Sequence, residues 1–271
     1  MMHIALIITT YNRPDALAAV LDGCLMQSDT NFEVLVADDG SARETADLIA
    51  SYQARAPFSI KHIWHEDAGF RAAAIRNRAL AVTSADYIVF IDGDCVMPPD
   101  FIASHRNLAE RGWFLSGNRL MLTPEFTGEV LRDKLPIHLW TLRDWLLARW
   151  RGQIERVLPL IRISGMNLLR KRLPVRWQGA KTCNLSAWRD DLLSVNGLDE
   201  SYTGWGLEDS DLVIRLLRAG IYNKSARFSV PVFHLYHPLN DRSNLEENRR
   251  RLQQALSATH LRALAGVDQY L

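Results

Sequence analysis

The sequence of 271 residues contains little cysteine, and its three cysteines, Cys24, Cys95 and Cys183, lie far apart. An odd number without a Cys-x-x-Cys pair argues against a secreted disulfide framework and against a zinc ribbon. A chain of this length buries enough surface to fold without cross-links. We therefore expect a protein of a reducing, cytoplasmic compartment.

Long apolar runs are also missing. The longest stretch without Asp, Glu, Lys or Arg is Phe228–Asn240, thirteen residues, whereas a membrane-spanning helix needs about 20. The first apolar run has no basic residue ahead of it and no small-residue cleavage site after it, so we do not expect a secretory signal. The motifs Gly-x-Ser-x-Gly, the Walker lysine loop and His-Glu-x-x-His are absent, which removes three common enzyme classes.

The charge is balanced overall but unevenly distributed. Hydrophobic residues make up 48% and charged residues 23%, as in ordinary globular proteins, and the net charge is +1. Residues 132–181, however, hold twelve basic and three acidic side chains, a net charge of +9, so the remainder carries −8. Four of the eight tryptophans lie in the same segment. This separation predicts a localised anionic partner, which we do not expect to be a nucleic acid.

Strand and helix patterns alternate through the first hundred residues. The predicted strands are His3–Thr9, Phe32–Ala37, Ile60–Trp64 and Tyr87–Ile91, and the predicted helices are Pro14–Met26, Ala42–Tyr52 and Phe70–Val82. Alternation with nearly continuous apolar strands indicates an α/β fold with a mostly parallel sheet covered on both faces. In such sheets the ligand binds at the carboxyl ends of the strands.

The second half is less regular. It predicts one or two strands in Phe114–Leu122, helices over 127–162, a poorly patterned basic stretch over 163–181, a new unit from Leu185 to Leu193, a helix over Glu208–Ala219, a strand over Phe228–Phe233 and a long helix over Asn244–Ala265. Gly220 provides a signal for the end of the helix before it.

Acidic residues follow two of the predicted strands. Asp92 and Asp94 flank Gly93, and carboxylates two residues apart on an extended segment project to one face. Such a pair suits Mg²⁺ or Mn²⁺ holding a diphosphate, whereas a solvated Asp-Gly turn is the simpler alternative. The position after a buried strand favours the metal site. Asp39 has two possible roles, a contact with a pyrimidine or ribose, and the capping of a helix. Tyr11 also has two, stacking on a base and packing in the core.

A second pair of acids, Glu208 and Asp209, begins a predicted helix, where the positive helix end favours ionised carboxylates. Trp205 precedes them between two glycines, and its ring suits the apolar face of a sugar. A plain acidic cap is the alternative. His234 and His237 stand at the end of a late strand, where a ligand role competes with that of ordinary surface or core histidines.

Taken in order, the segments IITTYNRPDAL, EVLVADDGS, GFRAAAIRNRAL and YIVFIDGDCVMPPDF resemble those of family 2 glycosyltransferases, which have the GT-A fold. The segment CNLSAWRDDLLSVNGLDESYTGWGLEDSDL resembles the C-terminal region of β-1,4-galactosyltransferases and bacterial chondroitin polymerases. The resemblance covers roughly residues 1–125 and 179–242. It implies a single domain with a UDP-sugar-binding half (1–125), a basic, tryptophan-rich helical insertion (126–178) and an acceptor-binding and metal-ligand half with a C-terminal helix (179–271).

The resemblance also implies roles for individual residues. Tyr11 and Asp39 match positions that contact uracil, with Thr9 or Thr10 adding backbone contacts. The helix that faces the nucleotide carries Arg71, Arg76 and Asn77. Asp92 is expected near the ribose and the metal, and Asp94 as a direct Mn²⁺ ligand. Trp205 and Glu208 are expected at the acceptor, Asp209 as the general base, and His234 or His237 as one further metal ligand, with the loop that follows favouring His237.

Together these features predict an inverting, metal-dependent glycosyltransferase. It would move a hexose or N-acetylhexosamine from a UDP-sugar to a glycan or glycolipid acceptor, forming a β-linkage. The resemblance alone implies that the acceptor is of the bacterial surface polysaccharide or lipopolysaccharide type. A UDP- or sugar-binding subunit without turnover is one alternative. A nucleotidyltransferase is another, but TTYNRPD is not the glycine-rich basic phosphate loop that it needs.

The insertion allows two interpretations. Apolar residues recur at roughly helical spacing within 131–150, among them Leu142, Trp145, Leu146 and Trp150, with Lys and Arg around them. A basic amphipathic helix with tryptophans is suited to an anionic membrane surface, here the inner face of the membrane. The alternative is a lid or helical pair packed on the catalytic sheet.

Overall fold

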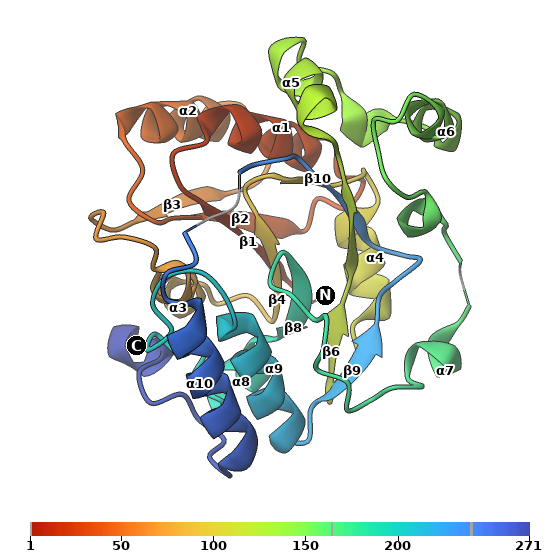
Figure 1. Cartoon of the computed structure of the whole chain (residues 1–271). Coiled ribbons are helices and arrows are strands. Elements are labelled where there is room, and N and C mark those ends of the chain that lie inside the picture. The colour runs from red at the N-terminus through yellow and green to blue at the C-terminus, as the bar shows by residue number, and fades with distance from the viewer. Residues whose placement is uncertain (1, 164, 239–240) are drawn as a thin grey trace.

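The computed structural model describes residues 2–163, 165–238 and 241–271. Its centre is a seven-stranded sheet with the order β3-β2-β1-β4-β8-β6-β9 (Figure 1). Its strands are β1 (Ile4–Thr10), β2 (Phe32–Asp38), β3 (Ile60–Trp64), β4 (Tyr87–Asp92), β6 (Trp113–Ser116), β8 (Asn184–Trp188) and β9 (Tyr222–Ser225). Only β8 runs antiparallel to its neighbours, so the predicted mostly parallel α/β sheet is confirmed.

Both faces of this sheet are covered, because successive side chains of each strand point to opposite sides. On β1, Leu6 and Ile8 belong to one core and Ala5 and Ile7 to the other. The first core also takes in α1 (Pro14–Leu25), α2 (Arg43–Gln53), α4 (Phe101–Leu108), α5 (Pro124–Arg132) and α6 (Leu142–Trp150). The second takes in α3 (Ala72–Val82), α8 (Arg189–Ser194) and α9 (Glu208–Arg218).

A small second sheet has the order β5-β10-β7, formed by β5 (Cys95–Val96), β10 (Pro231–His234) and β7 (Asn118–Met121). It joins the segment after Asp94 to a strand that lies much later in the chain. Trp145 of α6 packs against Phe233 of β10, with ring centroids 4.4 Å apart. The helical part of the insertion is therefore anchored on the same core as the catalytic sheet. None of the described helices is both long and apolar enough to cross a membrane.

The predicted bounds of two elements are wrong. The strand expected over Phe228–Phe233 begins only at Pro231, because Phe228 has a left-handed φ of 63° and Ser229 and Val230 donate to Ala226 in a turn. The predicted helix over Asn244–Ala265 ends at Ser257, as α10 (Leu245–Ser257). Beyond that residue the chain exchanges hydrogen bonds with another loop: Ala263 donates to Val195, and its carbonyl accepts from Asn196. The loop at Val195 and Asn196 therefore takes up hydrogen bonds that a continued helix would form within itself.

Candidate active site

The carboxyl ends of the parallel strands meet at one edge of the sheet. Thr10, Asp38 and Asp92 end β1, β2 and β4, and these three strands are neighbours. Because β8 is antiparallel, its first residue, Asn184, lies at the same edge. The polar clusters found in the sequence are thereby brought into one region, as expected for an α/β sheet.

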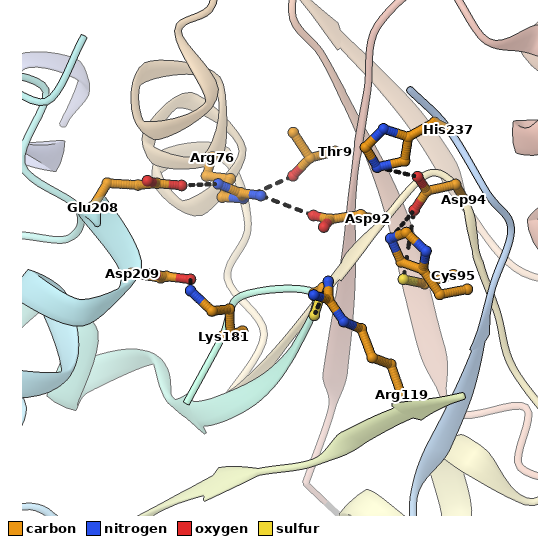
Figure 2. A network of polar contacts seen from close by, with 12 residues as sticks. Thr9, Arg76, Asp92, Asp94, Cys95, Arg119, Lys181, Glu208, Asp209 and His237 are labelled. Atoms are coloured by element: carbon orange, nitrogen blue, oxygen red, sulfur yellow. Dashed lines mark hydrogen bonds and ion pairs between the residues drawn. The ribbon is translucent and has the colours of Figure 1, made fainter. Parts of the chain in front are cut away.

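Asp94 lies between two imidazoles at this edge (Figure 2). Its carboxylate oxygens are 3.6 Å from Nε2 of His234 and 3.5 Å from Nε2 of His237. One ligand atom from each of the three residues lies within 4.8 Å of the others. From the sequence, either His234 or His237 was expected to be the further metal ligand, with His237 favoured. The structure brings both histidines to the same aspartate.

The pairing of β5 with β10 causes this convergence. His234 is paired with Cys95, and the Leu235 N–H donates to the Asp94 carbonyl at 2.9 Å. His237 is oriented by its own turn, since its Nδ1 lies 2.7 Å from the Pro238 carbonyl. A carbonyl only accepts, so this contact places the proton on Nδ1 and leaves the Nε2 lone pair facing Asp94.

The chemistry of these three residues fits a divalent metal ion. A histidine ligand must be neutral, and burial lowers the pKa of His234, which favours the neutral ring. Burial raises the pKa of Asp94, so a cation is needed beside it to stabilise the charged carboxylate. Because Mg²⁺ prefers oxygen ligands, two imidazoles favour Mn²⁺ over Mg²⁺.

Arg76 of α3 joins the ends of β1 and β4 to the start of α9 (Figure 2). Its guanidinium donates to Thr9 at 2.9 Å, to Asp92 at 2.9 Å and to Glu208 at 3.3 Å. Burial alone would lower its pKa, but the charges of Asp92, Glu208 and Asp209 raise it above the ordinary value. Arg76 is thus a fixed cation that holds three distant segments together.

The two adjacent acids occupy the first turn of α9 and are both buried. Asp209 lies 3.5 Å from Nζ of Lys181, whereas Glu208 faces Arg76 and keeps its second oxygen without a partner among the described residues. The preceding loop is strained: Leu207 has a φ of 79°, a left-handed conformation unusual for a branched side chain. This bend turns both acids towards the sheet edge.

Trp205 lies in the same loop and is partly exposed. The Arg242 guanidinium sits over its ring, 4.8 Å from the centroid. Asn248 of α10 donates to the carbonyls of Thr203 and Gly206 and so holds the loop in place. These contacts hold the Trp205 ring in the loop directly before the acid pair.

The environment of Glu208 gives a testable pH dependence. Burial and then the charge of Asp209 raise the pKa of Glu208 from 4.5 to about 7, although Arg76 opposes the shift. Between these values the folded protein keeps a proton that the unfolded chain releases, so the free energy of unfolding falls as pH rises. We expect Glu208→Gln to remove this part of the slope, a difference on the order of 1–3 kcal/mol across the window.

Urea denaturation of the metal-free protein between about pH 5 and about pH 8 measures this slope. Glu246→Gln is the matched control, because the Glu246 side chain is 86% exposed. Identical slopes for the wild type and Glu208→Gln would contradict the assignment of the shifted pKa to Glu208.

The predicted nucleotide-contact residues fall into two places. Asp39 and Tyr11 lie near the ends of β2 and β1, with Tyr11 48% exposed and its hydroxyl donating to Asp67 at 2.8 Å. Asp39 is buried, with oxygens 2.6 Å from Nε2 of His65 and 2.8 Å from the Arg71 N–H. Burial raises the pKa of Asp39 despite these contacts.

Asn77 lies apart from this group and needs a correction. It is fully buried, its amide donates to the Leu198 carbonyl and to Glu200, and its carbonyl accepts from the Leu198 N–H. These contacts use the whole side chain to attach α3 to the loop before α9. The resemblance implied that Asn77 faces the nucleotide together with Arg71 and Arg76. Successive residues of a helix point about 100° apart, however, and the Asn77 side chain points to the loop at Leu198. We leave Asn77 out of the proposed site.

Three residues that the sequence analysis did not single out contact the residues named above or lie close to them. His65 orients Asp39, Lys181 neighbours Asp209, and Arg119 of β7 donates to Cys183 Sγ at 3.8 Å. Within residues 2–163, 165–238 and 241–271, no ion pair joins Arg119 to a carboxylate. Burial lowers the pKa of Arg119, but Cys183, Cys95 and Asp92 together raise it above its ordinary value. Their segments carry no recognisable local pattern, since each acquires its neighbour only through the fold.

The chain matches two protein-family models. Residues 5–173, more than half of the chain, match the family model "Glycosyl transferase family 2". Residues 164–238 match the model described as "N-terminal domain of galactosyltransferase". The second match includes the acid pair and both histidines, and the first includes Asp92 and Asp94.

Curated relatives are longer than this chain. Validoxylamine A glucosyltransferase of Streptomyces hygroscopicus subsp. jinggangensis is 32% identical over 232 residues, covering 80% of this chain and 52% of its own. Hyaluronan synthase of Pasteurella multocida is 36% identical over 237 residues, covering 82% and 23%. Chondroitin synthase of Escherichia coli is 25% identical over 244 residues, covering 82% and 33%. The chain therefore spans about half or less of the length of these relatives.

Solved structures share the fold. Residues 1–349 of S. aureus TarS superpose with a TM-score of 0.61 at 13% identity, covering 99% of this chain and 68% of that chain. The mannosyltransferase PcManGT from Pyrobaculum calidifontis, in complex with GDP-Man and Mn²⁺, superposes with a TM-score of 0.58 at 17% identity, covering 94% and 62%. At these identities the likeness is evidence for the GT-A fold alone.

Proposed function

Because the chain belongs to glycosyltransferase family 2, we propose that it transfers a hexose or N-acetylhexosamine from a UDP-sugar to a glycan or glycolipid acceptor. The reaction would invert the anomeric centre and give a β-linked product. The acceptor is proposed to be a bacterial surface polysaccharide or lipopolysaccharide precursor. A TarS structure in complex with UDP-GlcNAc supports the choice of nucleotide, since that protein has the same fold.

One observation carries the proposal: a metal-ligand set and a pair of buried acids face the same sheet edge, joined through Arg76 (Figure 2). Transfer needs a cationic group at the leaving diphosphate and a base at the acceptor hydroxyl. Asp94, His234 and His237 supply ligands for the first, and Asp209 or Glu208 supplies the second. Arg76 links Asp92, two residues before Asp94, to Glu208 of the acid pair.

In the proposed step, the acceptor oxygen forms a bond to the anomeric carbon while the bond from that carbon to UDP breaks. The proton of the acceptor hydroxyl passes to the Asp209 carboxylate, and UDP leaves with the bonding electrons. A general base contributes about 10²–10⁴-fold to such a rate. A divalent ion bound by Asp94 and the histidines supplies positive charge that stabilises the departing diphosphate.

The remaining residues are proposed to orient the two substrates. Tyr11 offers its ring to uracil, and Asp39, held by His65, accepts from the uracil N–H. Arg119, a cation without a carboxylate partner among the described residues, is placed to contact phosphate. Trp205 offers its ring to the acceptor sugar.

A donor screen tests this function. The purified protein is incubated with UDP-glucose, UDP-galactose, their N-acetylated counterparts and GDP-mannose, with Mn²⁺ or with a chelator, and nucleotide release is measured. Release that depends on both metal and acceptor supports the proposal. Tight Mn²⁺–UDP binding without release for any acceptor would instead favour a subunit that only binds UDP or sugar.

The insertion supports a second proposal, attachment to an anionic membrane. Trp145 is buried and anchors α6, which agrees with the packed helical pair. On the other face of α6, however, Leu142, Leu146 and Trp150 are 58%, 50% and 84% exposed. They recur every four residues and so form one apolar stripe. Arginines flank it within a segment of net charge +9, which complements anionic lipid headgroups.

Flotation with liposomes checks this attachment. We expect binding to anionic but not neutral vesicles, weakened by salt, since each basic residue near such a surface contributes about 1 kcal/mol. Replacing Leu142, Leu146 and Trp150 together by glutamine is expected to reduce binding strongly. Leu264→Gln, at a site 86% exposed outside the insertion, is the control. No binding of the wild type to anionic vesicles at low salt would reject attachment and leave the packed insertion.

A further inference from the structure

A cavity of about 520 Å³ lies at the end of the sheet formed by β6 and β9. Its walls come from the ends of these strands and from the basic segment around α7 (Asn167–Arg170). Four arginines and no acidic residue line it: Arg170, Arg172, Arg176 and Arg227. This volume is in the range of sites that hold one small ligand or sugar-sized group.

Three of these guanidinium groups are available to a ligand. Arg170 is buried and donates to the carbonyls of Ser225, Arg227 and Ile163, so it builds the wall. Within the part of the chain that the structure describes, Arg172, Arg176 and Arg227 form no ion pair with a carboxylate.

Two lysines that neighbour the lining residues in sequence share one acid. Glu110 is paired with both Lys171 and Lys224 and leaves the cavity arginines uncompensated. Like charges gathered in one concavity repel one another, and a bound anion relieves that repulsion. The planar guanidinium matches carboxylate and phosphate groups through paired hydrogen bonds.

The strand order places this cavity at the same edge of the sheet as Asp92. β4, β6 and β9 run in the same direction, so their carboxyl ends share one edge of the sheet. Ser116 and Ser225, which line the cavity, are level with Phe90, two residues before Asp92. Neighbouring strands lie about 4.8 Å apart, so the cavity is roughly 10–15 Å from Asp92.

The segment next to Lys181, which contacts Asp209, also lines the cavity. Gln178 and Gly179 line it, and Lys181, two residues on, contacts Asp209. A chain of sugars whose terminal hydroxyl reaches Asp209 would pass this opening. We propose that the cavity is an acceptor subsite that binds an anionic group, carboxylate or phosphate, carried by the acceptor glycan a few sugar units from its reacting end. The inference rests on the proposed transferase function.

The test uses direct binding to the whole protein and not turnover. A short oligosaccharide that contains glucuronate, its carboxyl-reduced neutral counterpart and inorganic phosphate are titrated in chelator and followed by NMR of the arginine side-chain N–H groups. The variant replaces Arg172, Arg176 and Arg227 by glutamine. Arg43→Gln, at an 89% exposed side chain on α2, is the matched control. Arg170 is left intact because it holds the wall.

We expect the charged oligosaccharide and phosphate to bind and the neutral sugar to bind at least about tenfold more weakly. The triple variant should lose about tenfold or more of the affinity for the charged probe, and Arg43→Gln should not. Equal losses in both variants, or unchanged binding in the triple variant, would overturn the subsite. If the triple variant loses only its binding to anionic phospholipid vesicles, the arginines serve lipid headgroups and the acceptor proposal is wrong. Calorimetry of Mn²⁺ and UDP reports on the proposed transferase separately, so failure of one does not imply failure of the other.

Discussion

Asp94→Ala is expected to abolish Mn²⁺-dependent binding of UDP and with it sugar transfer, while the protein keeps its fold. The carboxylate is the group on which both histidines converge, at 3.5 and 3.6 Å. Loss of an outer partner of a metal site typically costs 10–100-fold in affinity or activity, so loss of a central ligand should exceed about 100-fold.

The fold should survive for two reasons. Burial already disfavours the charged carboxylate, as its raised pKa indicates, and the backbone contact of Asp94 with Leu235 does not involve the side chain. Calorimetric titration of UDP with and without Mn²⁺ measures the binding, and thermal denaturation checks the fold. Asp47→Ala, at an exposed acid on α2, should leave both unchanged.

The two histidines extend the experiment. Because both rings face Asp94, we expect His234→Ala and His237→Ala each to weaken Mn²⁺-dependent UDP binding, and the double variant to resemble Asp94→Ala. A loss confined to His237 would make His234 a buried neighbour that only supports Asp94. Unchanged Mn²⁺–UDP affinity in Asp94→Ala itself would remove the metal site from this edge of the sheet.

Asp209→Asn is expected to lower turnover by about 10²–10⁴-fold with the affinity for Mn²⁺–UDP nearly unchanged. The amide keeps the shape of the side chain and its contact with Lys181 but cannot take a proton. Among the described residues, Asp209 forms an ion pair with Lys181 and with none of the proposed metal ligands, so donor binding should depend little on it. Single-turnover measurement of product formation separates this loss from slow release of product.

Glu208→Gln distinguishes the two acids. Glu208 is held by Arg76, so its substitution should mainly raise the KM for the acceptor and disturb the position of Arg76. A pKa of about 7 would also suit Glu208 as a base, which makes the comparison decisive. If Asp209→Asn retains near wild-type turnover and Glu208→Gln does not, Glu208 is the base. Glu246→Gln, an exposed acid on α10, controls for general loss of negative charge.

The sequence predicts the core of the fold because local patterns are strong there. β1 and β2 are runs of buried aliphatic residues, and such runs form strands of a sheet covered on both faces. The order of strands and helices then requires Asp92 to end a strand at the ligand-binding edge. Elements held by distant contacts are predicted less well: α10 ends at Ser257, where another loop takes over the hydrogen bonds of the backbone.

The candidate site divides in the same way. The hydrophobic periodicity, the turn residues and the acids at the start of α9 are properties of short segments and can be identified without a structure. The folded chain was needed to see that His234 and His237 both face Asp94 and that Arg76 holds Thr9, Asp92 and Glu208. The same is true of Asn77, whose side chain points to the loop at Leu198 and not to the strand ends. These contacts join residues up to 143 positions apart, as in the pair Asp94 and His237, and they depend on the pairing of β5 with β10 and on the packing of α3 against the sheet. A segment specifies its own strand or helix through its neighbours, but the partner of a buried charge is set by which segments the whole core brings together.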